Sequence, residues 1–255
     1  YNSKGIPTNG IQGFVRHIFT AIKDIKPSHV AICWDMGQAT FRNDMYTSYK
    51  QNRPAPPDEL IPQFDYVKDI SEQFGFVNIG VANYEADDVI GTLAKIYSKD
   101  NEVHIVTGDR DILQCINEQV EVWLIRKGFN IYHHYTLNRF NEEYALHPLQ
   151  LIDIKAFMGD SADGYPGVKG IGEKTAIKLI QSYGSVENVL DNIESLTPNQ
   201  QKKIAIDKEN LILSKQLAKI YTDVPIDTTA LYEEMKYTHS LNHILSICNE
   251  HELYV

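Results

Sequence analysis

The stretch MGDSADGYPGVKGIGEKTA, residues 158–176, places two carboxylates directly before a glycine-rich loop that carries two lysines. Asp160 and Asp163 should repel a polyanion, whereas Lys169 and Lys174 should attract one. A divalent cation at the carboxylates would reverse their effect and let both halves face the same ligand. The stretch therefore predicts a metal site beside a phosphate-binding loop.

The glycine-rich half of the stretch has the features of a phosphate site. Gly167, Gly170 and Gly172 allow backbone N–H groups to approach a phosphate closely, and a helix predicted to begin near Gly172 would point its positive end outward. A plain connection between two helices can be equally rich in glycine, so the spacing alone leaves both interpretations open.

Upstream of this stretch, three short apolar runs alternate with helical patterns. The runs are rich in β-branched and aromatic residues, as expected of strands that are covered on both faces. They are residues 29–35, 76–81 and 103–109. Amphipathic helices are predicted after Asn9, ending near Pro27, and from Tyr84 to Tyr97.

The order of these elements predicts an α/β fold with a mostly parallel sheet flanked by helices on both sides. Residues 121–135 (EVWLIRKGFNIYHHY) predict two further strands joined near Lys127 and Gly128, as a hairpin at the margin of the sheet. Beyond this hairpin the strand patterns stop. We therefore expect an α/β core over residues 1–135 and a mainly helical region over residues 136–255.

The composition is that of an ordinary globular protein, with 43% hydrophobic and 23% charged residues and a net charge of −10. No apolar run approaches the ~20 residues of a membrane-spanning helix, and the first residues lack the layout of a signal peptide. Cys33, Cys115 and Cys248 are isolated from one another, which argues against a disulfide framework or a zinc site. We expect a cytoplasmic protein that makes no membrane contacts.

Eight carboxylates are predicted to converge on one edge of the sheet. Six of them follow strands, either directly or in the first turns of the next helix, and ligands bind at the carboxyl ends of parallel strands. The other two belong to the opening stretch. The eight are Asp35, Glu85, Asp87, Asp88, Asp109, Asp111, Asp160 and Asp163.

Each acid taken singly has a simpler interpretation, as a turn residue or as a helix start favoured by the macrodipole. Together they would repel one another in a cleft unless cations were bound. Oxygen ligands without nearby His or Cys motifs favour Mg²⁺ or Mn²⁺ over zinc. Eight acids exceed the needs of one ion, so we expect two or more, an arrangement suited to displacement at a phosphodiester.

A basic segment supplies the opposite charge. Residues 40–60 (TFRNDMYTSYKQNRPAPPDEL) carry Arg42, Lys50 and Arg53 interleaved with aromatic residues such as Tyr49. Cationic groups contact phosphates, and aromatic rings can stack on exposed bases. A solvated surface helix that ends at the prolines is the competing interpretation.

The motifs FR…YK-x-x-RP, EADDVIGTL, TGDRD and the opening stretch together resemble the bacterial 5′-nuclease family. This family comprises the flap endonuclease and 5′-3′ exonuclease domain at the N-terminus of DNA polymerase I and its standalone homologues. The similarity runs from about Gly5 to Asp223, and the chain is too short to include a polymerase. The resemblance implies a PIN-like core with a helical arch at about residues 40–62 and a helix-turn-helix-type DNA clamp at about residues 158–183.

The resemblance also implies roles for individual residues. The first metal position matches Asp35, Glu85, Asp87 and Asp88, and the second matches Asp109, Asp111, Asp160 and Asp163. Lys50 and Arg53 match the catalytic arch residues that contact the scissile phosphate, and Arg42 and Tyr49 match neighbouring DNA contacts. The clamp that grips duplex DNA, with K⁺ at its loop, matches Gly167, Lys169, Gly170, Gly172, Lys174 and Thr175.

The implied function is that of a divalent-metal-dependent, structure-specific 5′-nuclease acting in replication and repair, including RNA primer removal. Its expected partners are DNA with a 5′ flap or a 5′ end at a duplex junction, and RNA-primed DNA. Two alternatives remain: a junction-binding protein that has lost catalysis, and a metal-dependent ribonuclease or phosphatase of a related fold. The eight acids count against the first alternative and the clamp against the second.

One part of the family pattern is missing from this sequence. The family begins with an apolar strand that ends in Asp-Gly, and that Asp is a ligand near the first metal. This chain starts downstream of that point, at Tyr1. We expect further residues before Tyr1, because a polypeptide that began there would bind metal weakly and would lack a central strand.

Overall fold

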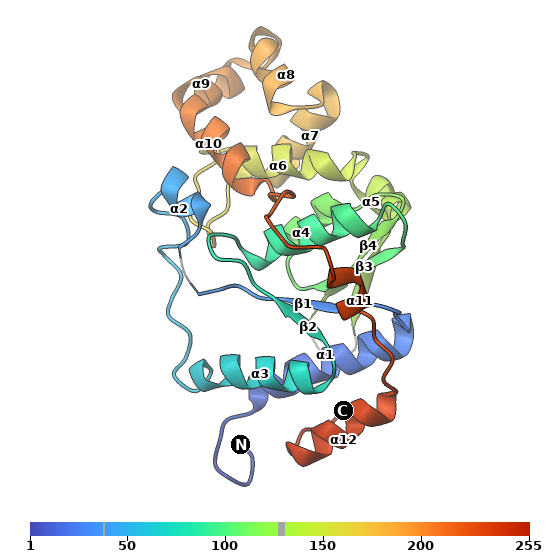
Figure 1. Cartoon of the computed structure of the whole chain (residues 1–255). Coiled ribbons are helices and arrows are strands. Elements are labelled where there is room, and N and C mark those ends of the chain that lie inside the picture. The colour runs from blue at the N-terminus through green and yellow to red at the C-terminus, as the bar shows by residue number, and fades with distance from the viewer. Residues whose placement is uncertain (38, 127–130) are drawn as a thin grey trace.

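The strands of the protein form two small sheets rather than one continuous sheet (Figure 1). This computed structural model describes residues 1–37, 39–126 and 131–255. In the first sheet, β1 (Ala31–Cys33) is parallel to β2 (Val77–Ile79). The predicted strands over residues 29–35 and 76–81 are therefore confirmed, although both are shorter than expected.

The second sheet contains three strands in the order β3, β4, β5. These are β3 (Val103–Thr107), β4 (Val120–Ile125) and β5 (Tyr132–Tyr135). β3 is parallel to β4, and β5 is antiparallel to β4. The mostly parallel arrangement with an antiparallel margin is confirmed, whereas the predicted junction at Lys127 and Gly128 lies outside the described residues.

Helices cover both faces of the first sheet, as predicted. One face is covered by α1 (Asn9–Ile25), α3 (Ile61–Gln73) and α12 (Leu241–Glu250), and the other by α4 (Ala86–Tyr97) and α11 (Leu231–Glu234). Ile32 packs with the first set of helices, whereas Ala31 and Cys33 pack with the second. This division follows from the alternation of side chains along a strand.

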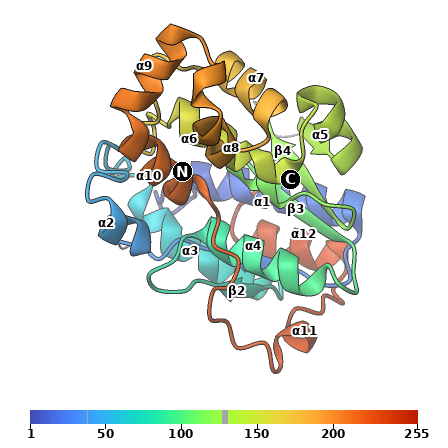
Figure 2. The same cartoon turned by 90° about the horizontal axis from the view of Figure 1, so that it is seen from above.

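The largest core lies between the second sheet and the helices that follow it. It joins Val122 and Leu124 of β4 to Phe140, Ile154 and Phe157 of the next helices. These helices are α5 (Leu137–Tyr144), α6 (Leu151–Met158), α7 (Glu173–Tyr183), α8 (Val186–Asp191), α9 (Pro198–Ile206) and α10 (Lys208–Ala218). Short 3-10 helices occupy Arg110–Cys115, Pro148–Gln150 and Ile193–Ser195. Figures 1 and 2 show α6 to α10 grouped at one end of the molecule.

The basic segment contains less helix than the predicted arch. Only α2 (Phe41–Met45) is helical within residues 40–60. Beyond it the chain makes turns and then runs through Pro54, Pro56 and Pro57, which cannot continue a helix because they lack a backbone N–H. In Figure 1 this segment runs along the left-hand edge, from α2 to α3. Among the described residues no helix is long and apolar enough to cross a membrane.

Candidate functional site

The ends of β1 and β3 and the start of α4 meet at one edge of the strand layer. Asp35, which follows β1, accepts a hydrogen bond through Oδ1 from the backbone N–H of Ala86, at 2.7 Å. Glu85 is the N-cap residue of α4, and Asp87 lies in its first turn. Asp109 follows β3 and caps the 3-10 helix after it by accepting from the N–H of Asp111, at 2.9 Å. Local capping thus fixes the backbone of acids that come from separate segments.

Asp87 and Asp109 share a hydrogen bond between their carboxyl groups. Burial, the charge of Asp109 and the charges of Glu85 and Asp35 raise the pKa of Asp87 to about 8. In the absence of a cation, Asp87 therefore holds a proton at neutral pH. The crowding of negative charge predicted from the sequence is a property of the folded protein.

Three further acids form a second group, here called the Asp111 group: Asp111, Asp160 and Asp163. Each offers a carboxylate oxygen, and these oxygens lie within 4.8 Å of one another. The turn after α6 sets their positions, because Asp160 Oδ1 accepts from the N–H of Asp163 at 2.9 Å. Burial raises the pKa of Asp111 to about 6, although the ammonium of Lys155 opposes this shift.

Lys155 of α6 is a site residue that the sequence patterns did not reveal. Its Nζ lies 2.5 Å from Asp160 Oδ2 and 3.3 Å from Asp111 Oδ1. The pKa of Asp160 lies below its usual range despite partial burial, mainly because of the hydrogen bond from Lys155. A single lysine that contacts acids has no sequence motif. Only the structure, in which Lys155 is largely buried against carboxylates, identifies it.

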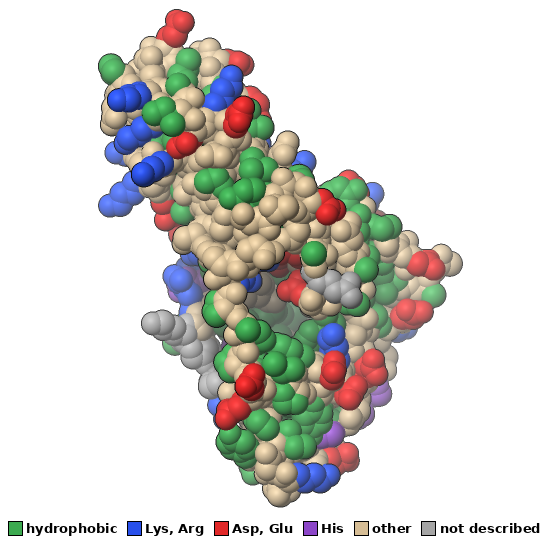
Figure 3. Space-filling model, turned by 90° about the vertical axis from the view of Figure 1, so that its left-hand side faces the viewer, with side chains coloured by type: hydrophobic (Ala, Val, Ile, Leu, Met, Phe, Trp, Pro, Cys, Tyr) green, Lys and Arg blue, Asp and Glu red, His purple; other side chains and the backbone are tan. Residues whose placement is uncertain are grey.

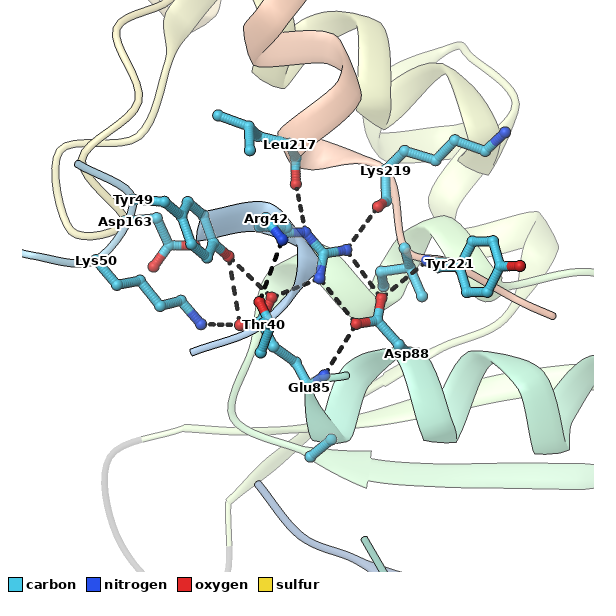
Figure 4. Close-up of polar contacts among 12 residues, drawn as sticks. Thr40, Arg42, Tyr49, Lys50, Glu85, Asp88, Asp163, Leu217, Lys219 and Tyr221 are labelled. Carbon is cyan, nitrogen blue, oxygen red and sulfur yellow. Dashed lines mark hydrogen bonds and ion pairs between the residues drawn. The ribbon is translucent and has the colours of Figure 1, made fainter. Parts of the chain in front are cut away.

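Arg42 is buried and ties three parts of the chain together (Figure 4). Its guanidinium donates to both oxygens of Asp88, each at 2.8 Å, and to Glu85 Oε2 at 2.5 Å. It also donates to the backbone carbonyls of Leu217 and Lys219, at 3.0 and 2.7 Å. In this arrangement Arg42 holds carboxylates and backbone rather than facing solvent.

Asp88 has all four of its acceptor positions in use. Besides the two bonds from Arg42, its oxygens accept from the N–H of Glu85 at 3.0 Å and from the N–H of Tyr221 at 2.9 Å. The side chain is fully buried. This geometry gives Asp88 a structural function in the metal-free protein, alongside the ligand role implied by the family resemblance.

Tyr49 and Lys50 lie against the acids (Figure 4), and Arg53 of the same segment also pairs with one of them. The hydroxyl of Tyr49 donates to Glu85 at 3.1 Å, and the Lys50 ammonium contacts Glu85 Oε1. Arg53 contacts Asp163 Oδ1. Tyr49 is buried, with an exposed fraction of 4%, so it reaches a ligand only if this segment moves.

The same segment is hydrogen bonded to the turn that carries Asp160 and Asp163. The N–H of Lys50 donates to the Asp163 carbonyl at 2.7 Å, and the Asn52 amide donates to the Ser161 carbonyl at 2.7 Å. Figure 3 shows the molecule hollowed between the two ends, with acidic side chains inside the hollow. The segment therefore lies over the acids and neutralises part of their charge.

In the region of the predicted clamp a loop joins α6 to α7, and α7 begins directly after Gly172. Gly167 has φ +61°, and a Cβ there would lie 2.3 Å from the backbone N of Gly159, so only glycine fits. The side chain of Lys203 in α9 donates to the carbonyl of Gly170 at 3.1 Å. The first amides of α7 have no intrahelical acceptor, which leaves them available to an anion.

The predicted DNA-binding residues of this clamp differ in accessibility. Lys169, Gly170, Gly172 and Lys174 are exposed, Thr175 is half-buried and Gly167 is buried. The exposed residues and the start of α7 lie at the end of the loop that begins with Asp160 and Asp163. A phosphate backbone held there would be bound by residues that are close in sequence to Asp160 and Asp163.

The donor set fits a hard divalent cation. All ligand atoms offered by the acids are carboxylate oxygens, which Mg²⁺ and Mn²⁺ prefer. The raised pKa of Asp87 shows that these acids are not all ionised together without added positive charge. Part of that charge comes from Arg42, Lys50, Arg53 and Lys155.

Two family models match the chain in succession. Residues 1–145 match the model described as "5′-3′ exonuclease, N-terminal resolvase-like domain". Residues 146–240 match the model described as "5′-3′ exonuclease, C-terminal SAM fold". The boundary between the two matches falls directly after α5, before the helices α6 to α10.

Individual relatives agree with these models. The 5′-3′ exonuclease of Bacillus subtilis (strain 168) is 46% identical over 252 residues, which covers 99% of this chain and 84% of the relative. DNA polymerase I of Lactococcus lactis subsp. lactis is 42% identical over 227 residues. That match covers 88% of this chain but only 26% of the polymerase.

Solved structures show the same fold. A bacteriophage T5 flap endonuclease in a complex with DNA and metal ions has a TM-score of 0.72 at 24% identity, covering 97% of this chain and 93% of that chain. The catalytic core of Rad2 with a DNA substrate has a TM-score of 0.58 at 18% identity, covering 96% and 81%.

Proposed function

This chain belongs to the 5′-3′ exonuclease family, and from that premise we propose that it is a divalent-metal-dependent 5′-nuclease acting on DNA. It hydrolyses phosphodiesters near junctions of single and double strands, releasing 5′ flaps and short oligonucleotides. The observation that carries the proposal is the convergence of acids from β1, α4, β3 and the turn after α6 beside an exposed, glycine-rich clamp loop.

The acids supply the ligands for divalent ions, which we propose to be Mg²⁺ or Mn²⁺, in two or more positions. Asp35, Glu85 and Asp87 serve one position with Asp109 beside them, and the Asp111 group serves another. A bound divalent ion would polarise the phosphodiester and offset its charge. Because Asp88 is saturated by hydrogen bonds, its main contribution is to hold Arg42 and the start of α4.

Lys50 and Arg53 change partners in this proposal. In the metal-free protein they neutralise Glu85 and Asp163. When divalent ions take over that neutralisation, both side chains become available to orient the phosphate of the strand that is cut. The segment from α2 to α3 thereby couples metal binding to substrate binding.

The clamp holds the duplex part of the substrate. The exposed amides at the start of α7 and the side chains of Lys169 and Lys174 contact backbone phosphates without reading sequence. We propose K⁺ at the clamp loop, RNA-primed DNA as a further substrate, and action in the cytoplasm during replication and repair.

A second candidate is a junction-binding protein that does not cleave. The observation that favours it is the internal pairing of the acids with Lys50, Arg53 and Lys155, which holds the site together without metal. The two candidates bind the same DNA and differ only in product formation.

A 5′-end-labelled flap duplex tests both candidates. With Mg²⁺ we expect cleavage near the junction, and with Ca²⁺ only binding. Asp160→Asn should abolish cleavage. Lys215→Met should not, because Lys215 pairs with Asp153 and Glu187, which are not among the proposed metal ligands. Binding without cleavage in Mg²⁺ would favour the second candidate, and binding that is unchanged by either ion would contradict the proposed coupling.

A further inference from the structure

Lys155 lies within the Asp111 group rather than beside it. Its ammonium is 2.5 Å from Asp160 Oδ2 and 3.3 Å from Asp111 Oδ1, so it contacts two of the three carboxylates. Its side chain is 15% exposed. The ammonium therefore shares oxygens that a divalent ion in this group would use.

Lys155 is less exposed than Lys50 and Arg53, the two cations that lie against the acids from the segment between α2 and α3. Lys50 and Arg53 have side chains that are 28% and 51% exposed, and they belong to the segment of turns between α2 and α3. Lys155 belongs to α6, where its neighbours Ile154 and Ala156 are part of the main core. The backbone of Lys155 is therefore fixed by core packing.

We propose that Lys155 is a positioning residue that sets the affinity of the Asp111 group for its divalent ion. Without metal, the ammonium holds Asp111 and Asp160 together and balances their repulsion. When a divalent ion enters, the same ammonium repels it and competes for the oxygens. The group therefore binds its ion weakly in the free protein, and it fills readily only when a phosphate of the substrate adds negative charge.

The inference rests on the proposed function only in so far as the Asp111 group binds a divalent ion. It assigns different affinities to the two acidic positions. At the position near Asp87, Arg42 and Lys50 contact Glu85. Among the described residues no ion pair joins a cation to Asp35, Asp87 or Asp109, so this position should fill first. The Asp111 group should fill second, in the presence of DNA.

Counting bound Mn²⁺ tests this assignment without measuring cleavage. Free Mn²⁺ is followed by electron paramagnetic resonance as wild-type protein, Lys155→Met and Lys155→Arg are titrated at pH 7.5. We expect Lys155→Met to bind the second ion about tenfold more tightly or better, and Lys155→Arg to resemble the wild-type protein, because the positive charge is kept. Adding Asp160→Asn to Lys155→Met should remove the increase in affinity for the second Mn²⁺ ion.

Lys215→Met is the matched control. Lys215 also bridges two carboxylates, Asp153 at 2.7 Å and Glu187 at 2.8 Å, but outside the acidic site. Its replacement should leave Mn²⁺ binding unchanged. Equal Mn²⁺ affinities in Lys155→Met and the wild-type protein would overturn the proposal.

Thermal unfolding provides a second measurement if Lys155→Met is poorly stable. The variant should melt at a lower temperature than the wild-type protein in EDTA, and saturating Mn²⁺ should raise its melting temperature by more than that of the wild-type protein. An equal Mn²⁺-dependent rise in the two proteins would contradict the role of Lys155. Absence of flap cleavage by the wild-type protein would contradict the proposed function instead, and would leave this comparison intact.

Discussion

Arg42 and Asp88 form a bidentate pair in which two guanidinium N–H groups each lie 2.8 Å from a carboxylate oxygen. The exposed fractions of the two side chains are 3% and 0%. Because Arg42 also binds the carbonyls of Leu217 and Lys219, the pair joins α2, α4 and the C-terminal end of α10. The start of α4, with its acids, is positioned by contacts that are distant in sequence.

Replacing Arg42 by Gln should lower the free energy of unfolding by about 3–5 kcal/mol, because the change leaves a buried carboxylate without its partner. Urea denaturation measures this loss. The double variant Arg42→Gln with Asp88→Asn should lose less than the sum of the single losses, since neither charge is left alone. Lys95→Gln, which breaks an exposed pair with Asp223, should cost no more than about 1 kcal/mol. An Arg42→Gln protein as stable as the wild-type protein would exclude this structural role.

The carboxyl group of Asp87 should make the metal-free protein less stable as the pH rises. Its pKa is raised from 3.8 to about 8, so between these values the folded protein retains a proton that the unfolded chain has lost. The stabilisation is complete below the lower value and is lost as the pH approaches the upper one, with a slope of at most about 1.4 kcal/mol per pH unit. Thermal unfolding in EDTA at several pH values measures the slope. Asp87→Asn should flatten it, and a slope that persists in this variant would assign it to another group.

Divalent metal binding should release protons from the same carboxyl group. At pH 7 Asp87 is protonated in the metal-free protein, and a ligand carboxylate must be ionised. Calorimetric titration with Mg²⁺ in buffers of different ionisation enthalpy counts the protons. We expect about one proton released at pH 7 and fewer at pH 9, where Asp87 is already ionised. Release that did not depend on pH would contradict the raised pKa.

Two glycines of the clamp should differ in how much an alanine substitution destabilises the protein. Gly167→Ala should destabilise the protein by about 2–5 kcal/mol, because the residue has φ +61° and the new Cβ would lie 2.3 Å from the N of Gly159. Gly172→Ala should cost less than about 1 kcal/mol, since its φ is −93° and the space around it is open. Urea denaturation of both variants makes the comparison, and equal losses would show that the packing of Gly159 against Gly167 is not what fixes the loop.

Lys174 should contribute one phosphate contact to duplex binding. Lys174→Gln should reduce the slope of log affinity against log salt concentration by about 1. Fluorescence anisotropy of a labelled duplex in Ca²⁺ measures the slope. Lys95, in the last turn of α4, pairs with Asp223, whereas the acids lie at the start of that helix. Lys95→Gln therefore serves as the control and should leave the slope unchanged. A steeper or unaltered slope for Lys174→Gln would remove this residue from the DNA interface.

Local patterns predicted the elements that depend on local chemistry. The apolar period after Asn9 predicted α1, and the glycine before Glu173 predicted the start of α7. The convergence of acids followed from the rule that ligands bind at the carboxyl ends of parallel strands. These features depend on neighbouring residues or on a general property of sheets.

Burial of the basic segment could not be predicted in the same way. Arg42 and Tyr49 occupy a polar, basic sequence, which is typical of an exposed surface. Their burial arises from Leu217, Lys219 and Glu85, and the first two carry no motif. Lys155 could not be predicted for the same reason. The tertiary structure brings Asp111 and Asp160 to it, and no spacing along α6 indicates these contacts.

The loop from Gly159 to Gly172 carries Asp160 and Asp163 at one end and the start of the clamp helix at the other. The backbones of Gly159 and Gly167 pack against each other, so an inserted residue would disturb the loop. In the proposed nuclease the clamp would hold the duplex at a fixed position. The covalent length of the loop would then determine how many nucleotides separate that position from the cut.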